Sequence, residues 1–212
     1  MEPLIQLINI NKQYPNKEIF KNFNLEIHKN QKVLIMGASG TGKSTILNIL
    51  GLLENIDSGE TIHFGKRNLK PNSNQAIKLL RDKISYLFQN YALIDSDTVY
   101  DNLVIAMKYS KDKNKKEIIN HALTMVGLNG FEKREVYTLS GGEQQRVALA
   151  RLIIKPSEII LADEPTGNLD DKNAFQIIRI LDYLSSLGKT IVMVTHDHRF
   201  IDFFDVVISL SE

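Results

Sequence analysis

The stretch GASGTGKST, Gly37 to Thr45, decides the fold class of this chain. It lies between the apolar run KVLIMG and a helical pattern, and it contains two glycines separated by four residues and followed by Lys43 and Ser44. In that context the backbone N–H groups of the loop surround phosphate groups, while the lysine reaches the β and γ oxygens and the hydroxyl binds Mg²⁺. A glycine-rich turn of another α/β protein is the alternative. The strand before the loop and the helix after it favour a phosphate-binding P-loop.

Short apolar runs alternate with helical patterns through the rest of the chain. Such continuous runs are typical of strands buried on both faces of a parallel sheet. From Asp170 to Gly188 apolar residues recur at helical spacing, with Asp170 or Asp171 as the cap, which predicts a βαβ unit. Three runs in the N-terminal third predict antiparallel strands instead. The expected parallel strands are residues 32–37, 84–88, 159–163 and 190–195, and the expected antiparallel strands are 5–10, 20–28 and 60–65.

The sequence therefore predicts a single α/β domain over residues 1–212, a P-loop NTPase with a mainly parallel core sheet. The ATP-binding core with its antiparallel β part would comprise residues 1–90 and 135–212. Residues 91–134 are more polar and rich in helical patterns, and they would form a helical subdomain. Within them the charge run KYSKDKNKKE, Lys108 to Glu117, indicates a solvated loop and helix start, with a lipid-facing surface as the alternative.

Length and composition exclude several other classes. The chain has 212 residues, a formal net charge of +1 and no cysteine. A nearly neutral charge gives no electrostatic reason to expect nucleic acid as a partner, and without cysteine there are no disulfides or thiolate metal sites. The N-terminus lacks the pattern of a signal peptide, and no apolar run is long enough to span a bilayer. If the protein acts at a membrane, we expect another chain to cross it.

Two acidic residues, Asp163 and Glu164, end the apolar run that begins at Ile159. Side chains at the carboxyl end of a parallel strand lie in the crevice where α/β sheets bind ligands. Asp163 can hold Mg²⁺ through water, and Glu164 can polarise an attacking water as general base. A capped turn before Pro165 is the alternative. His196 follows another predicted strand in the same way, and it is either a contact of the γ-phosphate or an ordinary surface residue.

A second glycine-containing motif, LSGGEQQR (Leu139 to Arg146), precedes the apolar helical pattern VALARLII. A glycine pair at the start of a helix lowers helix stability unless the backbone has a task there. The unpaired N–H groups of a helix N-terminus bind anions. The chain therefore has two predicted phosphate sites, and the P-loop already supplies one.

Six motifs, in this order and over essentially the whole chain, resemble the ATP-binding subunit of ABC transporters. The motifs are GASGTGKST, LFQ ending in Gln89, LSGGEQQR, IILADE, GNLD at residues 167–170, and His196. The resemblance implies an ABC-type fold in which LSGGEQQR is the signature motif that closes over the γ-phosphate of ATP bound to the other subunit. Two copies arranged head to tail about a two-fold axis would then share two ATP sites, each with a P-loop from one chain and a signature from the other. ADEPTGNLD and LSGGEQQRVALAR resemble the branch that contains lipoprotein-releasing, macrolide-exporting, cell-division and bacteriocin-exporting ATPases.

The resemblance also implies roles for individual residues. Tyr14 would stack on adenine, with a core tyrosine at a strand end as the alternative. Gln89 would sense Mg²⁺ and the attacking water, and Asp170 would cross the dimer to the opposite P-loop. Catalysis would rest on Glu164, His196 and Gln89. The expected ATP-binding residues are Tyr14, Gly37, Ala38, Ser39, Gly40, Thr41, Gly42, Lys43, Ser44 and Thr45; those that contact the ATP of the opposite subunit are Ser140, Gly141, Gly142 and Glu143; the expected Mg²⁺ ligands are Ser44, Gln89 and Asp163.

The function implied is hydrolysis of ATP with Mg²⁺ by a homodimer that drives a separate membrane permease. The chain would bind at the cytoplasmic face of the membrane, and the branch it resembles favours export of a peptide, lipoprotein or drug-like substrate. An ATPase that signals across the membrane without transport stays open. Three other classes are disfavoured. A ribosome-acting ABC ATPase would resemble two cassettes in one chain, and this chain holds one. A DNA-repair ATPase needs a long coiled coil, which residues 45–138 do not predict, and a GTPase needs an Asn-Lys-X-Asp motif, which does not follow the P-loop. The chain ends soon after FDVVISL, which argues against the sugar-importer branch with its C-terminal regulatory domain.

The segment Asn90 to Met107 is more apolar than an exposed connector requires. Some of its apolar side chains must pack inward. We expect the others to form a groove beside Gln89 that receives a short helix of the permease. The candidates are Tyr91, Leu93, Ile94, Val99, Tyr100 and Leu103, with the first three as the main docking residues.

Overall fold

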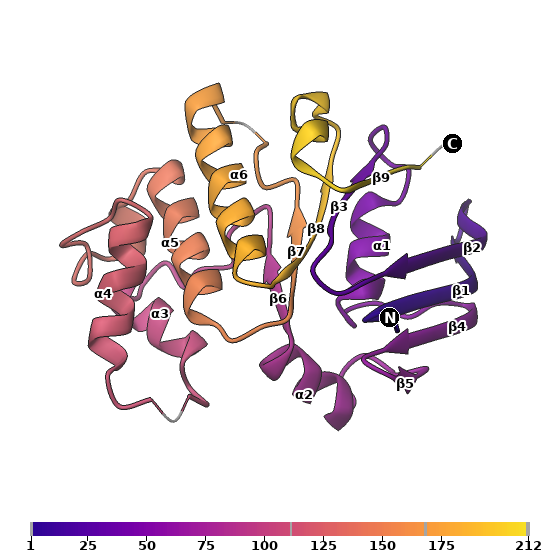
Figure 1. Ribbon diagram of the computed structural model, residues 1–212, viewed down its shortest axis with the longest axis horizontal. Coiled ribbons are helices and arrows are strands. Elements are labelled where there is room, and N and C mark those ends of the chain that lie inside the picture. Colours follow the sequence, from indigo (N-terminus) through magenta and orange to yellow (C-terminus); the bar gives the residue numbers. More distant parts are fainter. Residues whose placement is uncertain (1, 111, 168, 211–212) are drawn as a thin grey trace.

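The computed structural model describes residues 2–110, 112–167 and 169–210. These residues form a parallel sheet in the middle, an antiparallel sheet on one side of it and a group of helices on the other (Figure 1). The architecture is the α/β arrangement expected from the sequence.

The parallel sheet has five strands in the order β6–β7–β8–β3–β9, and every neighbouring pair is parallel. The four predicted parallel strands are confirmed, and the run FDVVISL supplies the fifth. The strands are β3 (Lys32–Met36), β6 (Ile84–Leu87), β7 (Ile159–Asp163), β8 (Thr190–Thr195) and β9 (Val206–Ser209).

The strands are continuously apolar because each face of the sheet is buried in a different core. In β3, Leu34 and Met36 belong to the core beneath the helices, whereas Val33 and Ile35 point into the core shared with the antiparallel sheet. Successive side chains of a strand point to opposite faces, so a strand covered on both sides is apolar at most of its positions; the buried Ser85 of β6 is an exception.

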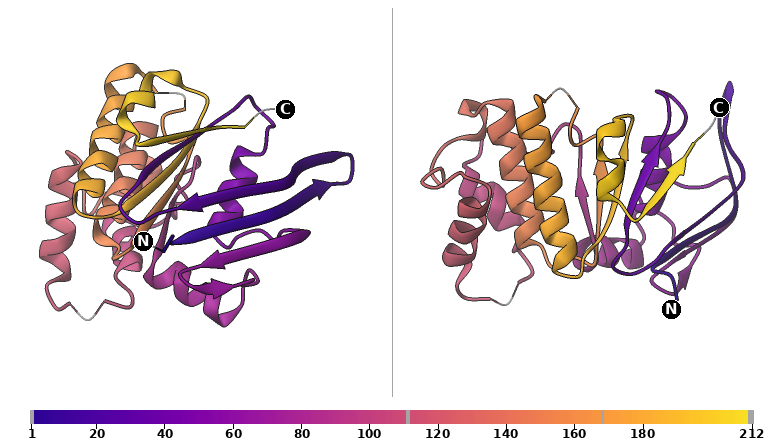
Figure 2. Two further views of the ribbon diagram at one scale, coloured as in Figure 1. Left: turned by 45° about the vertical axis from the view of Figure 1, so that its right-hand side comes forward. Right: turned by 45° about the horizontal axis from the view of Figure 1, so that its top comes forward.

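The antiparallel sheet has the strand order β2–β1–β4–β5. Its strands are β1 (Ile5–Tyr14), β2 (Lys17–Ile27), β4 (Ser58–His63) and β5 (Lys66–Arg67). The three predicted strands are confirmed as antiparallel, and the first two are longer than expected. Their hairpin is long in both views of Figure 2. At its end Lys17, which pairs with Tyr14, donates to the carbonyl oxygen of Gly40 in the P-loop at 2.7 Å.

The helices are α1 (Lys43–Leu50), α2 (Asn74–Asp82), α3 (Val99–Ala106), α4 (Lys115–Met125), α5 (Gly141–Ile154) and α6 (Asp171–Ser186), with the 3₁₀ turns η1 (Val136–Thr138) and η2 (His198–Phe203). Helix α5 contacts α3, α4 and α6 and so joins the predicted helical subdomain to the core. The division of the chain at residues 91 and 134 stays a prediction. Among the described residues, no helix combines the length and the apolar character needed to cross a bilayer.

Candidate functional site

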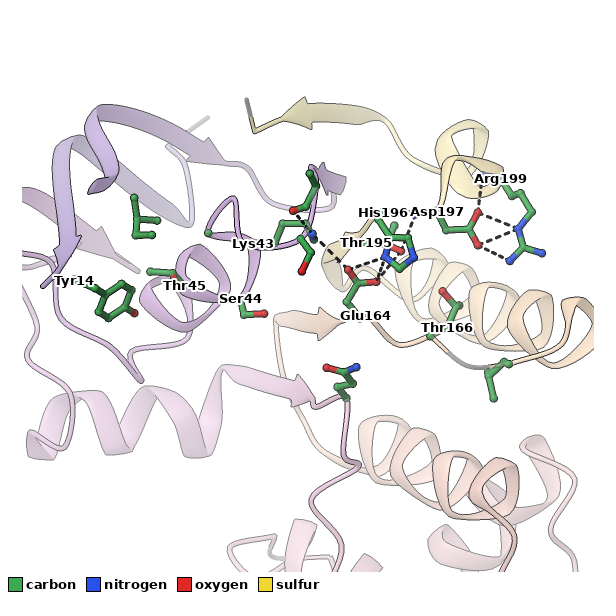
Figure 3. A pocket seen from close by; sticks show the side chains of 18 residues that line it. Tyr14, Lys43, Ser44, Thr45, Glu164, Thr166, Thr195, His196, Asp197 and Arg199 are labelled. Atoms are coloured by element: carbon green, nitrogen blue, oxygen red, sulfur yellow. Dashed lines mark hydrogen bonds and ion pairs between the residues drawn. The ribbon is translucent and has the colours of Figure 1, made fainter. Parts of the chain in front are cut away.

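A cavity of about 950 Å³ lies where the carboxyl ends of β3, β7 and β8 meet (Figure 3). These strands are adjacent and parallel, so the loops that follow them reach the same edge of the sheet. The predicted residues that line the cavity are Tyr14, Ala38, Ser39, Gly40, Gly42, Lys43, Ser44, Thr45, Gln89, Glu164 and His196. The structure therefore brings together side chains that are far apart in the sequence.

The P-loop needs glycine for two different reasons. At Gly42, which precedes α1, φ is 96°, and a Cβ would lie 2.4 Å from Cγ2 of Ile19. At Gly37 a Cβ would lie 2.5 Å from Oγ1 of Thr41 and 2.9 Å from the carbonyl oxygen of Leu210. Backbone conformation and close packing thus exclude larger residues at the two glycines that define the motif.

Lys43 lies inside the loop. Its side chain is only 8% exposed, and Nζ donates to the carbonyl oxygens of Gly37 at 2.8 Å and Ala38 at 2.9 Å. Nζ also lies 3.7 Å from Oε1 of Glu164. A buried ammonium group with this orientation supplies a fixed positive charge where the phosphates of a nucleotide would lie.

The hydroxyl of Ser44 donates to Oδ1 of Asp163 at 3.1 Å. Burial raises the pKa of Asp163, and the hydrogen bond from Ser44 partly opposes that rise. Both groups present oxygen atoms, which are the ligands that Mg²⁺ prefers. The pair is therefore suited to hold Mg²⁺.

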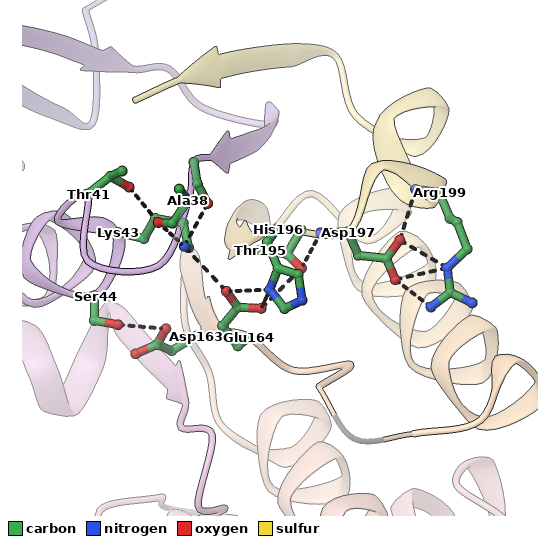
Figure 4. A network of polar contacts seen from close by, with 11 residues as sticks. Ala38, Thr41, Lys43, Ser44, Asp163, Glu164, Thr195, His196, Asp197 and Arg199 are labelled. Carbon is green, nitrogen blue, oxygen red and sulfur yellow. Dashed lines mark hydrogen bonds and ion pairs between the residues drawn. The ribbon is translucent and has the colours of Figure 1, made fainter. Parts of the chain in front are cut away.

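The carboxylate of Glu164 is the centre of a polar network (Figure 4). Oγ1 of Thr195 donates to Oε2 at 3.2 Å, and Nδ1 of His196 lies 3.0 Å from the same oxygen. The Glu164 side chain is 15% exposed, whereas that of His196 is 71% exposed. The backbone of Glu164 is left-handed, with φ 43°. A strained residue held by its neighbours at the end of a strand is typical of a functional site.

Tyr14 lies at the far end of the cavity. The residue is 42% exposed, its hydroxyl donates to Glu54, and the ammonium group of Lys12 lies 5.1 Å from the ring centroid. The hydrogen bond fixes the ring direction while leaving much of the ring uncovered. Its position is compatible with the predicted stacking on adenine.

The signature residues lie outside this cavity. The side chain of Ser140 caps α5, and Oε2 of Glu143 accepts from the backbone N–H of Ser140 at 2.8 Å, which completes a capping box. The hydrogen bonds from Ser140 lower the pKa of Glu143. Glu143 thus has a local structural role, and its predicted contact with ATP stays a prediction.

Gly141 and Gly142 have no conformational need to be glycine within this chain. Neither has a positive φ. A Cβ would find its nearest neighbour at 3.9 Å for Gly141 and at 3.8 Å for Gly142. The glycine pair is therefore not required by the packing of a single copy.

Asp170, the predicted contact of the opposite P-loop, is the cap of α6. Its carboxylate accepts from the backbone N–H of Asn173 at 2.8 Å and from the side-chain amide of Asn173 at 2.9 Å. Asn168, within the GNLD motif, lies outside the described residues. Asp170 does not line the nucleotide cavity of its own chain.

Several cavity residues were not predicted: Ile19, Thr166, Leu169, Thr195, Asp197 and Arg199. Thr195 and Asp197 flank His196, so the strand end that indicated the histidine also contained them. Arg199 is bound to Asp197 and Asp171, and the hydrogen bond from Arg199 lowers the pKa of Asp197. Ile19 carried no sequence signal, because only the β1–β2 hairpin brings it to the P-loop.

The residues predicted to form the docking groove differ in burial, and docking at Tyr91, Leu93 or Ile94, of which Ile94 is 44% exposed, stays a prediction. Val99 and Leu103 are fully buried, and Tyr91, Leu93 and Tyr100 pack against the core beneath the helices. A second cavity of about 450 Å³ does open nearby, but Tyr91, Leu93 and Ile94 do not line it. Its walls, here called the apolar groove, include Leu53, Leu80, Tyr86, Phe88, Ala92, Ile105, Ala106, Tyr109, Arg151 and Lys155.

The sequence is similar to those of known transporter ATPases. The family model described as ABC transporter matches residues 20–167. The macrolide export ATP-binding/permease protein MacB of Pasteurella multocida is 36% identical over 100% of this chain, which spans 33% of that protein. The uncharacterized ABC transporter ATP-binding protein MJ1508 of Methanocaldococcus jannaschii is 39% identical, covering 99% of this chain and 96% of that protein.

Solved structures agree with the sequence matches. The dimeric structure of MJ0796, a bacterial ABC transporter cassette, superimposes with a TM-score of 0.88 at 36% identity and covers 97% of this chain and 94% of that one. The same cassette in a dimeric post-hydrolysis state bound to ADP and Pi gives a TM-score of 0.87.

A P-loop, an acidic pair and a histidine on one edge of a parallel sheet are the features of a P-loop ATPase. More narrowly, the chain belongs to the ABC transporter family as an ATP-binding, ATP-hydrolysing cassette. It spans about one third of the length of the MacB relatives it matches.

Proposed function

We propose that two copies of this chain pair head to tail around two ATP molecules and that hydrolysis drives a membrane permease. The cassette would act from the cytoplasmic face of the membrane, and the permease would export a peptide, lipoprotein or drug-like molecule. Relatives named for macrolide and pyoverdine export support that direction. No contact with nucleic acid is proposed, because the net charge of +1 provides no electrostatic attraction.

One observation supports the pairing above all: the glycine pair at the start of α5. Glycine at a helix start costs stability relative to alanine, yet neither Gly141 nor Gly142 is required by its own chain. The exposed N–H groups there are free to approach an anion closely. The ATP held by Lys43 of one copy would be covered by Ser140, Gly141 and Gly142 of the other.

In this proposal Glu164 is the general base that takes a proton from the attacking water. Thr195 and His196 hold the carboxylate in place, and Lys43 stabilises negative charge on the β and γ oxygens. The side chain of His196 is exposed on its other side and can contact the γ-phosphate. Tyr14 would bind the adenine, and Asp170 would reach the partner's P-loop.

The oxygen atoms of Ser44 and Asp163, with the side-chain carbonyl of Gln89, would hold Mg²⁺. When bound, the ion neutralises charge on the phosphate oxygens. Ser44 and Asp163 are already hydrogen-bonded to each other, so these two oxygens need no large rearrangement to face one ion.

The apolar groove is the proposed docking site for the permease. Three of its wall residues are strongly exposed for apolar side chains: Leu53 at 43%, Ile105 at 51% and Tyr109 at 65%. Exposed apolar side chains around a concavity favour a partner segment that buries them. MacB combines ATP-binding and permease parts under one name, which supports a membrane protein as the partner.

Cysteine cross-linking tests the head-to-tail arrangement, and the chain has no native cysteine to interfere. One chain carries Ser39→Cys in the P-loop, and a second, differently tagged chain carries Thr138→Cys beside the signature, both with Glu164→Gln to retain ATP. We expect a mixed disulfide only when ATP is present. Ser186→Cys at the end of α6 replaces Thr138→Cys in the control. A disulfide that forms equally with Ser186→Cys, or without ATP, contradicts the arrangement.

A further inference from the structure

Residues Gln89 to Ala92 connect the two cavities of the molecule. Gln89 lines the nucleotide cavity, and Ala92, three residues later, lines the apolar groove. The segment begins two residues after the end of β6 and precedes α3. Its conformation therefore decides how Gln89 is placed relative to the groove.

The backbone of this segment is strained at two consecutive residues. Tyr91 has φ 62° and Ala92 has φ 46°, both in the left-handed region. A Cβ makes that region unfavourable, and two successive residues rarely adopt it unless their surroundings hold them there. The backbone N–H of Ala92 donates to the carbonyl oxygen of Asn90 at 2.7 Å, which is a local contact and gives no anchor outside the segment.

Arg151 provides the external anchor. Its Nη1 donates to the carbonyl oxygen of Ala92 at 2.7 Å and its Nη2 to that of Tyr91 at 2.6 Å. The planar guanidinium group holds two acceptors at a fixed spacing, which the single ammonium group of lysine cannot do. One side chain thus binds the two carbonyl groups of the two strained residues.

We infer that Arg151 is a positioning residue: by binding both carbonyl groups it keeps Tyr91 and Ala92 in the left-handed conformation, and the segment then places Gln89 at the nucleotide cavity. This inference rests on the role proposed above for Gln89. Arg151 belongs to α5, whose first turn carries the signature motif. A movement of α5 when two copies close on ATP would therefore reach Gln89 and the groove through the same side chain.

The chain contains a matched control for this role. Lys189, just before β8, lines neither cavity and donates to two backbone carbonyl oxygens, that of Lys155 at 2.9 Å and that of Ser157 at 3.2 Å. Its acceptors lie outside the segment that carries Gln89. Arg151→Lys and Lys189→Arg both keep one positive charge, so they differ in which backbone segment loses its native contacts.

For Arg151→Lys we expect kcat for ATP hydrolysis to fall roughly tenfold while the Kd for ATP stays within about twofold, because Gln89 is misplaced but the P-loop is intact. Hydrogen exchange at the amides of residues 90–92 should become faster. Lys189→Arg should change neither quantity. The double variant Arg151→Lys with Ala92→Gly should recover much of the lost kcat, since glycine adopts the left-handed conformation without the strain that a Cβ causes.

The variant Gln89→Ala distinguishes a failure of the role proposed for Gln89 from a failure of the positioning role of Arg151. If Gln89→Ala hydrolyses ATP at the native rate, the role of Gln89 is wrong and the positioning role falls with it. If Gln89→Ala is slow but Arg151→Lys keeps the native kcat, Arg151 does not position Gln89. Equal losses in Arg151→Lys and Lys189→Arg, or no recovery with Ala92→Gly, also overturn the inference.

Discussion

Oε2 of Glu164 lies 3.0 Å from Nδ1 of His196. The histidine follows β8 and the glutamate follows β7, and the two strands are neighbours in the parallel sheet. The same carboxylate accepts from Thr195 and lies 3.7 Å from the ammonium group of Lys43. The end of β7, the end of β8 and the start of α1 thus hold the Glu164 carboxylate at the edge where the nucleotide would bind.

Glu164→Gln should keep ATP binding and lower turnover roughly 100-fold or more, because the amide holds the same space but cannot take a proton. Retained ATP should then hold two copies together, which size-exclusion chromatography with ATP and Mg²⁺ detects as a dimer. Glu158→Gln, at the opposite end of β7, serves as the control. A monomeric Glu164→Gln variant with native turnover would remove the residue from catalysis.

Tyr14→Ala should weaken ATP binding by about 1 kcal/mol, the scale of an aromatic contact, while Tyr14→Phe keeps the affinity. Fluorescent nucleotide titration measures both. Tyr183 is an equally exposed tyrosine at 42%, and it lies on α6 outside the cavity, so Tyr183→Ala should have no effect. Unchanged affinity in Tyr14→Ala, with native circular dichroism, would show that the ring does not contact adenine.

The apolar groove gives a different docking prediction from the one the sequence suggested. Ile105→Asp and Tyr109→Asp should abolish co-purification with the permease and leave hydrolysis by the isolated cassette unchanged, because a buried unpaired carboxylate opposes docking. Ile94→Asp is the control, since Ile94 is 44% exposed but lies outside the groove. Loss of binding in Ile94→Asp alone would return the docking site to the segment predicted from sequence.

His63 makes the stability of the fold dependent on pH. The residue is 1% exposed, and burial lowers the pKa of His63 from 6.5 to about 4, although hydrogen bonds with the backbone of Ile49 and Leu50 act in the opposite direction. Because the folded pKa is below the unfolded one, the neutral side chain contributes stability above pH 6.5 that is lost as the pH falls toward 4.

Between pH 7.5 and pH 5 this effect should lower the free energy of unfolding by about 2 kcal/mol, measured by urea denaturation at both pH values. His63→Gln should be less stable than the native chain at pH 7.5 but should lose less stability on acidification. His121→Gln is the control, because His121 is exposed on α4. An equal pH dependence in the native chain and His63→Gln would show that His63 is not the responsible group.

The sequence determined the features that depend on short stretches of chain. The P-loop, the parallel strands and the capped start of α6 each follow from apolar periodicity, glycine conformation and capping within a few residues. The edge that collects Lys43, Asp163, Glu164 and His196 was also predictable, because parallel strands bring their carboxyl ends together. Helix α2 was not predicted, although Ala76, Leu79 and Leu80 recur at helical spacing and Ser73 caps the start.

Only the tertiary structure decided which apolar side chains of the segment after Gln89 face outward. The sequence shows that Tyr91, Leu93 and Ile105 are all apolar, but burial depends on contacts with α5 and the core, which lie far away along the chain. The hydrogen bonds from Arg151 to Tyr91 and Ala92 likewise join residues about 60 positions apart. Local patterns specify the elements, whereas the packing of distant elements decides which surface is left open and which strained backbone is held in place.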